Sequence, residues 1–146
     1  MSTIDAYRSA QIQHAPPEQI LLLLLERAVK DQSAALDAMD RGARLTWVAQ
    51  LNHARSIFIE LQSALDHTLS PQLSRHLHEV YGWALHHLAR AARDGDPELL
   101  RAVQTVTLSL HEAWTAAIEQ SYADAEEIVA NLDVGPVPPS AFSGAP

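Results

Sequence analysis

Residues 94–117 read DGDPELLRAVQTVTLSLHEAWTAA, and this stretch decides the fold class. Gly95 is suited to end one helix, because glycine readily adopts the left-handed conformation that closes many helices. Asp96 and Pro97 are suited to begin the next helix, as its N-cap and its first-turn residue. Apolar residues then recur at alternating spacings of four and three, which keeps them on one helical face: Leu99, Val103, Val106, Leu110, Ala113 and Ala117. The stretch therefore predicts a tight connection followed by an amphipathic helix.

The same punctuation predicts three more helices upstream. The first follows Pro16-Pro17 and ends near Asp40, just before Gly42. The second begins near Thr46, which can act as its N-cap, and carries the apolar stripe Trp47, Leu51, Ala54, Phe58, Leu61 and Leu65. The third begins at Ser70-Pro71, and one of its faces carries Leu73, Leu77, Val80, Ala84, Leu88 and Ala91.

Four amphipathic helices with short connections bury their stripes best side by side, so we predict an all-α, antiparallel four-helix bundle. Residues 1–132 are assigned to this single domain, with the period of the fourth helix continuing through Ile128 and Val129. Residues 1–15 form a short N-terminal arm. Residues 133–146 are rich in proline and cannot build a core, which predicts a disordered tail.

The composition excludes several classes of function. The chain has 146 residues, a net charge of −8 and no cysteine. The negative charge argues against binding nucleic acid or anionic lipid, and the absence of cysteine excludes disulfides and thiolate chemistry. The aliphatic run Ile20–Leu25 is far too short to cross a membrane, and no signal peptide is visible. We therefore expect a cytoplasmic protein without membrane insertion.

No motif in the chain supports catalysis or a cofactor. Four of the eight histidines lie on the third predicted helix, but neither a Glu-x-x-His pair nor a His-Glu-x-x-His motif occurs. Gly-x-Ser-x-Gly and glycine-rich phosphate loops are absent as well. The sequence therefore predicts no enzyme activity, no metal and no cofactor.

More apolar residues are present than single stripes require. Ile20–Leu25 covers every face of nearly two helical turns, which fits either a helix packed centrally or a second face that lines a groove for a partner helix. Tyr81 and Leu85 lie beside the third stripe, and Ile57 lies beside Phe58, so the same two explanations apply there.

Read in order, several segments resemble the flagellin-specific export chaperones, the FliS family. The match runs without gaps over about residues 4–118 and is carried jointly rather than by one motif. Its pieces are Ala6-Tyr7, Ala15-Pro16-Pro17-Glu18-Gln19-Ile20, Glu79-Val80-Tyr81 with Leu85 and Leu88, Asp94-Gly95-Asp96, and Glu112-Ala113-Trp114.

The resemblance implies a cytosolic chaperone that binds the disordered C-terminal segment of flagellin in an apolar groove. Such a protein prevents premature polymerisation and brings flagellin to the flagellar type III export gate. We expect Ile57, Leu61, Tyr81 and Leu85 to line the groove. The resemblance also implies an N-terminal arm that covers part of the groove, here through Ile4 and Tyr7, whereas the alternative is a frayed terminus.

Two other functions compatible with these residues are a non-catalytic helical adaptor or oligomerisation protein and a chaperone of another exported subunit. The sequence leaves the oligomeric state open, a homodimer included. From Glu112 onward the chain has six acidic residues and no lysine or arginine, so most of the net negative charge lies at its C-terminal end. We interpret this acidic end as an aid to solubility or to the steering of a basic partner.

Overall fold

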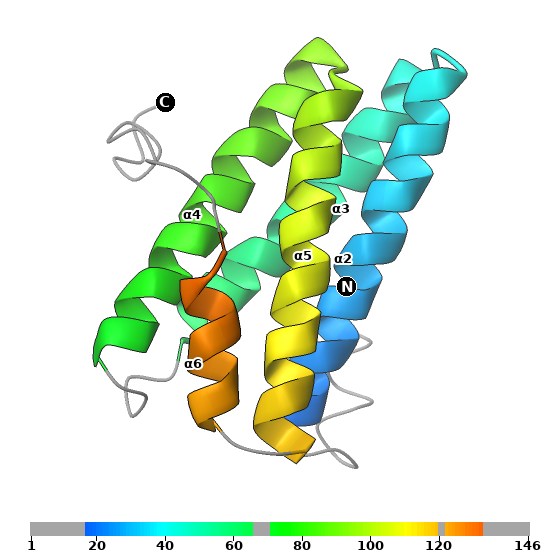
Figure 1. The fold of residues 1–146 in the computed structure, drawn as a ribbon. Coiled ribbons are helices and arrows are strands. Elements are labelled where there is room, and N and C mark those ends of the chain that lie inside the picture. Colours follow the sequence, from blue (N-terminus) through cyan, green and yellow to red (C-terminus); the bar gives the residue numbers. More distant parts are fainter. Residues whose placement is uncertain (1–16, 66–70, 120–121, 133–146) are drawn as a thin grey trace.

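The computed structural model describes residues 17–65, 71–119 and 122–132, and all regular structure within them is helical (Figure 1). The helices are α2 (Pro17–Asp40), α3 (Arg44–Ser63), α4 (Pro71–Asp94), α5 (Pro97–Glu119) and α6 (Tyr122–Ala130). The predicted arm, Ser70 and the predicted tail lie outside the described residues.

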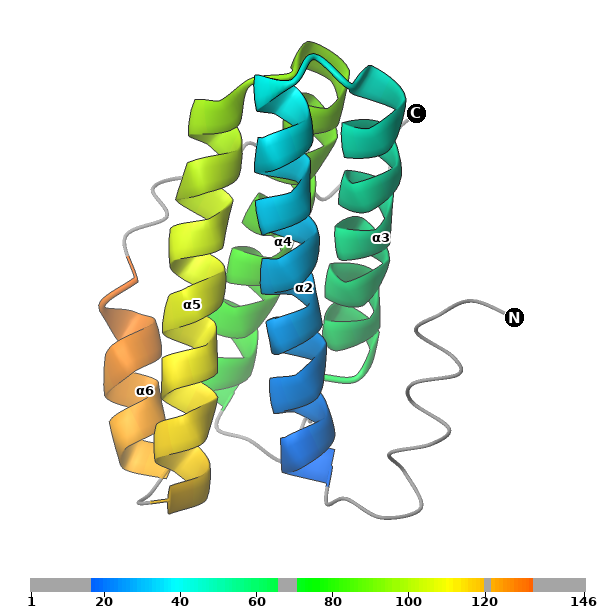
Figure 2. The same cartoon turned by 90° about the vertical axis from the view of Figure 1, so that its right-hand side faces the viewer.

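The four long helices form the predicted antiparallel bundle. Each successive helix runs opposite to the one before it, and α2 packs against both α3 and α5, as does α4 (Figure 2). This closed square arrangement gives every long helix two neighbours. Each helix therefore needs an apolar arc broader than a single stripe.

The turns follow the predicted punctuation with one exception. Gly42 and Gly95 have φ of 67° and 66°, the left-handed conformation expected at helix ends. Asp96 caps α5, because its Oδ1 accepts a hydrogen bond of 2.9 Å from the Glu98 amide. The prediction of Thr46 as an N-cap is wrong: α3 begins at Arg44, and no side chain caps it.

The core contains most of the predicted stripes. All six predicted residues of α4 are buried, and four of the six in α3 are buried. In α5 the stripe is shifted at its start, because Leu100 is fully buried whereas Leu99 is only partly so. Thr107 and Trp114 join the buried side of α5 as well. The square packing explains both additions, since α5 contacts α2 on one side and α4 on the other.

A fifth described helix, α6, packs against the bundle rather than extending α5. Periodicity through Val129 predicted a longer fourth helix, but α5 ends at Glu119 and α6 runs back beside it, also contacting α4 (Figures 1 and 2). Val129 is 2% exposed and belongs to the core, with Ile128 and Leu132 packed against it. Reversing the chain is what allows these apolar side chains to reach the bundle.

Candidate client-binding surface

The four residues expected to line a groove occupy different environments. Ile57, Leu61 and Tyr81 are 0%, 2% and 1% exposed and belong to the central core. In this conformation the three side chains are covered by their neighbours, and their role in lining a client groove stays a prediction. Leu85 is partly exposed and packs against the edge of the core. The extra apolar residues at Ile57 and Tyr81 meet the needs of helices that each pack against two neighbours.

Tyr81 joins three helices from the middle of α4. Its ring centroid lies 6.2 Å from that of Phe58 on α3, with the planes tilted by 57°. Burial raises the pKa of the Tyr81 hydroxyl, and the neighbouring Trp114 indole of α5 opposes that rise only in part. The hydroxyl is therefore neutral at physiological pH, and Tyr81 serves the packing of the bundle.

Partly exposed apolar side chains gather at the end of the bundle where α2 begins. Leu24 and Leu25 are buried, but the four residues before them remain partly exposed. The end of α3 and the end of α5 lie at the same end of the bundle (Figures 1 and 2). We call the set at this end the apolar collar: Ile20, Leu21, Leu22, Leu23, Leu65, Ala117 and Ile118.

The packing divides the apolar run in α2 into a buried part and a partly exposed part. Central packing explains Leu24 and Leu25, which are 5% and 0% exposed. It does not explain Leu23, which remains partly exposed, or Ile118, which is 40% exposed. The sequence signal was the run that is apolar on every helical face, but only the packing shows which of its members reach the surface.

The middle of α2 is attached to α3 by a buried polar contact. Asp31 is 2% exposed, and its Oδ2 lies 2.5 Å from Nδ1 of His53 on α3. Burial raises the pKa of Asp31, while the hydrogen bond and charge of His53 and the charge of Arg27 oppose that rise. The Arg27 Nε lies 3.5 Å from the other carboxylate oxygen. This contact fixes the position of α3 along α2.

A second buried polar contact attaches α2 to α5. Gln32 is fully buried, and its Nε2 donates a hydrogen bond of 3.0 Å to the hydroxyl of Thr107. That hydroxyl donates in turn to the Val103 carbonyl at 2.8 Å. Nearer the surface, Gln104 donates a 2.8 Å hydrogen bond to Ser33. Together these contacts hold α2 in a defined register between its two neighbours.

The histidines of α4 pack or face outward. His87 lies against Trp83, with ring centroids 4.3 Å apart, and burial lowers its pKa. Within the ranges given above, no three histidine or acidic side chains come close enough together to share a metal ion. No helix among the described residues combines the length and apolar character needed to cross a bilayer.

The comparison with known families decides the identity of this bundle. Residues 1–121 match the family described as flagellar protein FliS. The chain belongs to the FliS family. The match spans the four-helix bundle, whereas α6 lies beyond it. The chain is also similar to the flagellar secretion chaperone FliS of Vibrio cholerae serotype O1, with 23% identity over 116 residues, which cover 77% of this chain and 85% of that protein.

Proposed function

We propose that this FliS-family protein is a cytosolic export chaperone that binds the C-terminal segment of newly made flagellin. The observation that carries the proposal is the family match across all four helices of the bundle. The name of the Vibrio cholerae relative, a flagellar secretion chaperone, supports it. By covering that segment, the protein prevents early polymerisation and keeps flagellin competent for type III export.

The apolar collar is the surface we assign to the client. A disordered segment that folds on binding needs an apolar surface to cover its own apolar face. The collar supplies that surface at one end of the bundle, where it includes the exposed side of Leu23 and Ile118. Ordering the client offsets part of the gain from burial, so binding remains reversible, as export requires.

The groove and arm residues that the sequence predicted differ in their roles in this proposal. Leu85 is partly exposed but is not a member of the collar, so we do not assign it to the client, while Ile57, Leu61 and Tyr81 support the bundle from within. The arm with Ile4 and Tyr7 directly precedes the collar in the chain, and we propose that it covers the collar when no client is bound.

A pair of leucine variants tests the proposed surface. Leu23→Ser places a hydroxyl in the collar, whereas Leu45→Ser changes a leucine that is 88% exposed at the beginning of α3, far from the collar (Figures 1 and 2). Binding of a flagellin C-terminal peptide is measured by calorimetry, with urea unfolding to verify that both variants fold. Leu23→Ser should weaken binding about tenfold, because a buried leucine contributes on the order of 1.5–3 kcal/mol.

Equal affinities for the two variants would exclude the collar as the client site. A complex that forms equally well with flagellin lacking its C-terminal segment would contradict the proposed client segment. If the protein binds a different exported flagellar subunit in preference to flagellin, the proposal of a chaperone still holds, but the client is that subunit and not flagellin. Contact with the export gate and formation of a homodimer stay predictions, which native mass spectrometry of the purified complex can test.

A further inference from the structure

Charge is divided unevenly between the two sides of the bundle. The helices α3 and α4 contain five arginines and three acidic residues, a net charge of +2, together with five histidines. The helices α2, α5 and α6 contain three cations and eleven acidic residues, a net charge of −8, and one histidine. The overall charge of the chain therefore conceals a positive side formed by α3 and α4.

Four of the five arginines of that side form no ion pair with a carboxylate among the described residues. Four arginines of the described chain form ion pairs with nearby carboxylates: Arg27 with Asp31, Arg41 with Asp37, Arg93 with Asp94, and Arg101 with Glu98. Lys30 on α2 forms none with any described residue, and Arg44, Arg55, Arg75 and Arg90 form none either. Of these arginines, Arg44 donates a hydrogen bond to the Arg93 carbonyl and lies over the Trp47 ring, which leaves Arg55, Arg75 and Arg90. All three lie on α3 or α4. The hydrogen bond from Arg93 and, at longer range, the charge of Arg90 lower the pKa of Asp94, so Arg90 has an acidic neighbour although it forms no ion pair.

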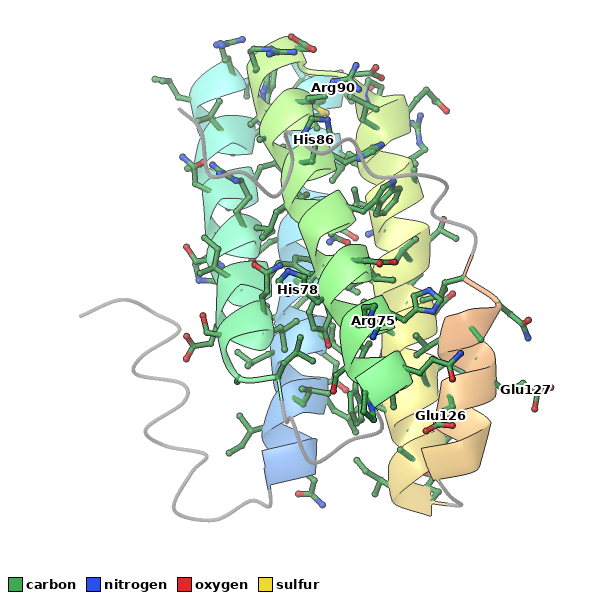
Figure 3. All side chains as sticks on the ribbon, turned by 90° about the vertical axis from the view of Figure 1, so that its left-hand side faces the viewer. Arg75, His78, His86, Arg90, Glu126 and Glu127 are labelled. Atoms are coloured by element: carbon green, nitrogen blue, oxygen red, sulfur yellow. The ribbon has the colours of Figure 1, made fainter. Side chains whose placement is uncertain are left out.

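Figure 3 shows how the charges lie along α4. Arg75, His78, His86 and Arg90 follow the length of the helix on the side that faces the viewer, whereas Glu126 and Glu127 lie on the neighbouring α6. Arg75 and Arg90 are fifteen positions apart, about 22 Å along the helix axis. That length corresponds to about four turns of a second helix laid alongside.

Apolar surface accompanies these arginines at the junction of α3 and α4. Val48, Leu85 and Ala89 are only partly buried. Gln62, seven positions after Arg55 and fourteen after Val48, donates a hydrogen bond to the His78 carbonyl on α4, which indicates that this side of α3 faces α4. The Nε of Arg55 is buried without a hydrogen-bond partner among the described residues.

We propose that this arginine face, formed by Val48, Arg55, Arg75, Leu85, Ala89 and Arg90, binds an acidic amphipathic helix of a partner protein. The apolar side of that helix lies over the strip containing Val48 and Leu85. Carboxylates along its edges pair with Arg75 and Arg90, four turns apart. This surface differs from the apolar collar, and the inference does not depend on flagellin being the client.

The charges favour an acidic protein segment over other occupants. A nucleic acid would be repelled by the net charge of −8, which three arginines without ion pairs cannot offset over its length. A second copy of this chain could present its own acidic side, and the test below separates that outcome by measuring self-association without any added partner.

The test uses a synthetic amphipathic helical peptide of about 16 residues, long enough to span the arginine face, with leucines on one face and glutamates along its edges. A peptide with glutamine in place of every glutamate is the charge control. The variant R75E/R90E is compared with K30E/R101E, which makes the same change in net charge on α2 and α5. Fluorescence anisotropy gives the affinities, and thermal unfolding verifies the fold of both variants.

We expect the glutamate peptide to bind the unmodified protein more tightly than the glutamine peptide does. R75E/R90E should weaken that binding about tenfold, and K30E/R101E less than about twofold, because each exposed pair contributes modestly and reversal adds repulsion. Equal losses in the two variants, or equal binding of both peptides, would overturn the proposal. Sedimentation velocity of the protein without peptide tests self-association. A dimer that R75E/R90E abolishes would overturn the proposal, because the arginine face would then bind a second copy of this chain. Flagellin-peptide affinity unchanged in R75E/R90E would confirm that the two surfaces are separate.

Discussion

The indole of Trp47 lies directly against Gly95. A Cβ atom placed on Gly95 would stand 2.8 Å from Cζ2 of that indole, closer than carbon atoms normally approach. The same indole donates a hydrogen bond of 3.0 Å to the carbonyl of Ala92. The first turn of α3 is thus packed against the connection between α4 and α5, and this connection requires a residue without a side chain.

Replacing Gly95 by alanine should cost more stability than the same change at Gly42. Both glycines have positive φ, which costs alanine about 1 kcal/mol at either position. Nothing lies within 4 Å of a Cβ at Gly42, whereas a Cβ at Gly95 meets Trp47. We expect Gly95→Ala to lose about 1–2 kcal/mol more in urea unfolding, because a rigid indole must shift. Equal losses of stability in Gly95→Ala and Gly42→Ala would show that the Trp47 indole can shift without a measurable cost in stability.

The buried contact between α2 and α5 should respond strongly to loss of one hydroxyl. Thr107→Val removes the acceptor of the Gln32 amide, and a buried amide left without a partner costs about 1–3 kcal/mol. Thr105→Val is the control, since that exposed hydroxyl donates only to the Arg101 carbonyl of its own helix. Changing Gln32→Leu together with Thr107→Val should recover stability, and failure to recover would mean that shape rather than hydrogen bonding sets the loss.

Asp31 should make stability depend on pH. Burial raises its pKa above the ordinary value of 3.8, so the folded state holds the proton more tightly than the unfolded state. The stabilisation from Asp31 is therefore fully present below pH 3.8 and is lost as pH rises through the folded-state pKa. The unfolding free energy of the unmodified protein, relative to Asp31→Asn, should fall as pH increases from about 3.5 to 7.

Chemical denaturation across that pH range provides the measurement. Asp37→Asn is the matched control, because Asp37 is 70% exposed and pairs with Arg41 on the surface. A difference between the unmodified protein and Asp31→Asn that stays constant with pH would show that His53 and Arg27 fully offset the burial of the carboxylate.

The proposed arm should compete with the client. Ile4→Ala combined with Tyr7→Ala should tighten flagellin-peptide binding or speed association, because the collar would no longer need to be uncovered. Gln11→Ala combined with Gln13→Ala leaves the apolar residues of the arm intact and serves as the control. Stopped-flow fluorescence measures both rates. Unchanged affinity and association rate would remove this role from the arm.

Docking of α6 should depend on one buried side chain. Val129→Asp places a carboxylate where the side chain is 2% exposed, which should release α6 because an unpaired buried charge is costly. Ala130→Asp adds the same charge at an exposed neighbour and should leave α6 in place. Hydrogen exchange of the α6 amides distinguishes the two, and equal protection in both variants would contradict packing through Val129.

Local signals were sufficient to predict the four long helices and the connections between them, but not the separate helix α6. Gly95, Asp96 and Pro97 act within a few residues of their own positions, and all three have the predicted roles. All six residues of the stripe predicted for α4 are buried, because the spacing of apolar residues identifies one face of a helix. The start of α3 was predicted two residues late, since Thr46 has the chemistry of a cap but the chain turns earlier, at Ala43.

The sequence by itself determined that this protein is a bundle of antiparallel helices, because the spacing of apolar residues specifies which of them share a face and the short connections make successive helices run in opposite directions. Only the tertiary structure decided which extra apolar residues are core and which are surface. Ile57 and Tyr81 are buried because each helix has two neighbours, whereas Leu23 stays partly exposed at the end of the bundle. The pairing of Asp31 with His53 also depends on a contact between distant segments, which a local pattern cannot show.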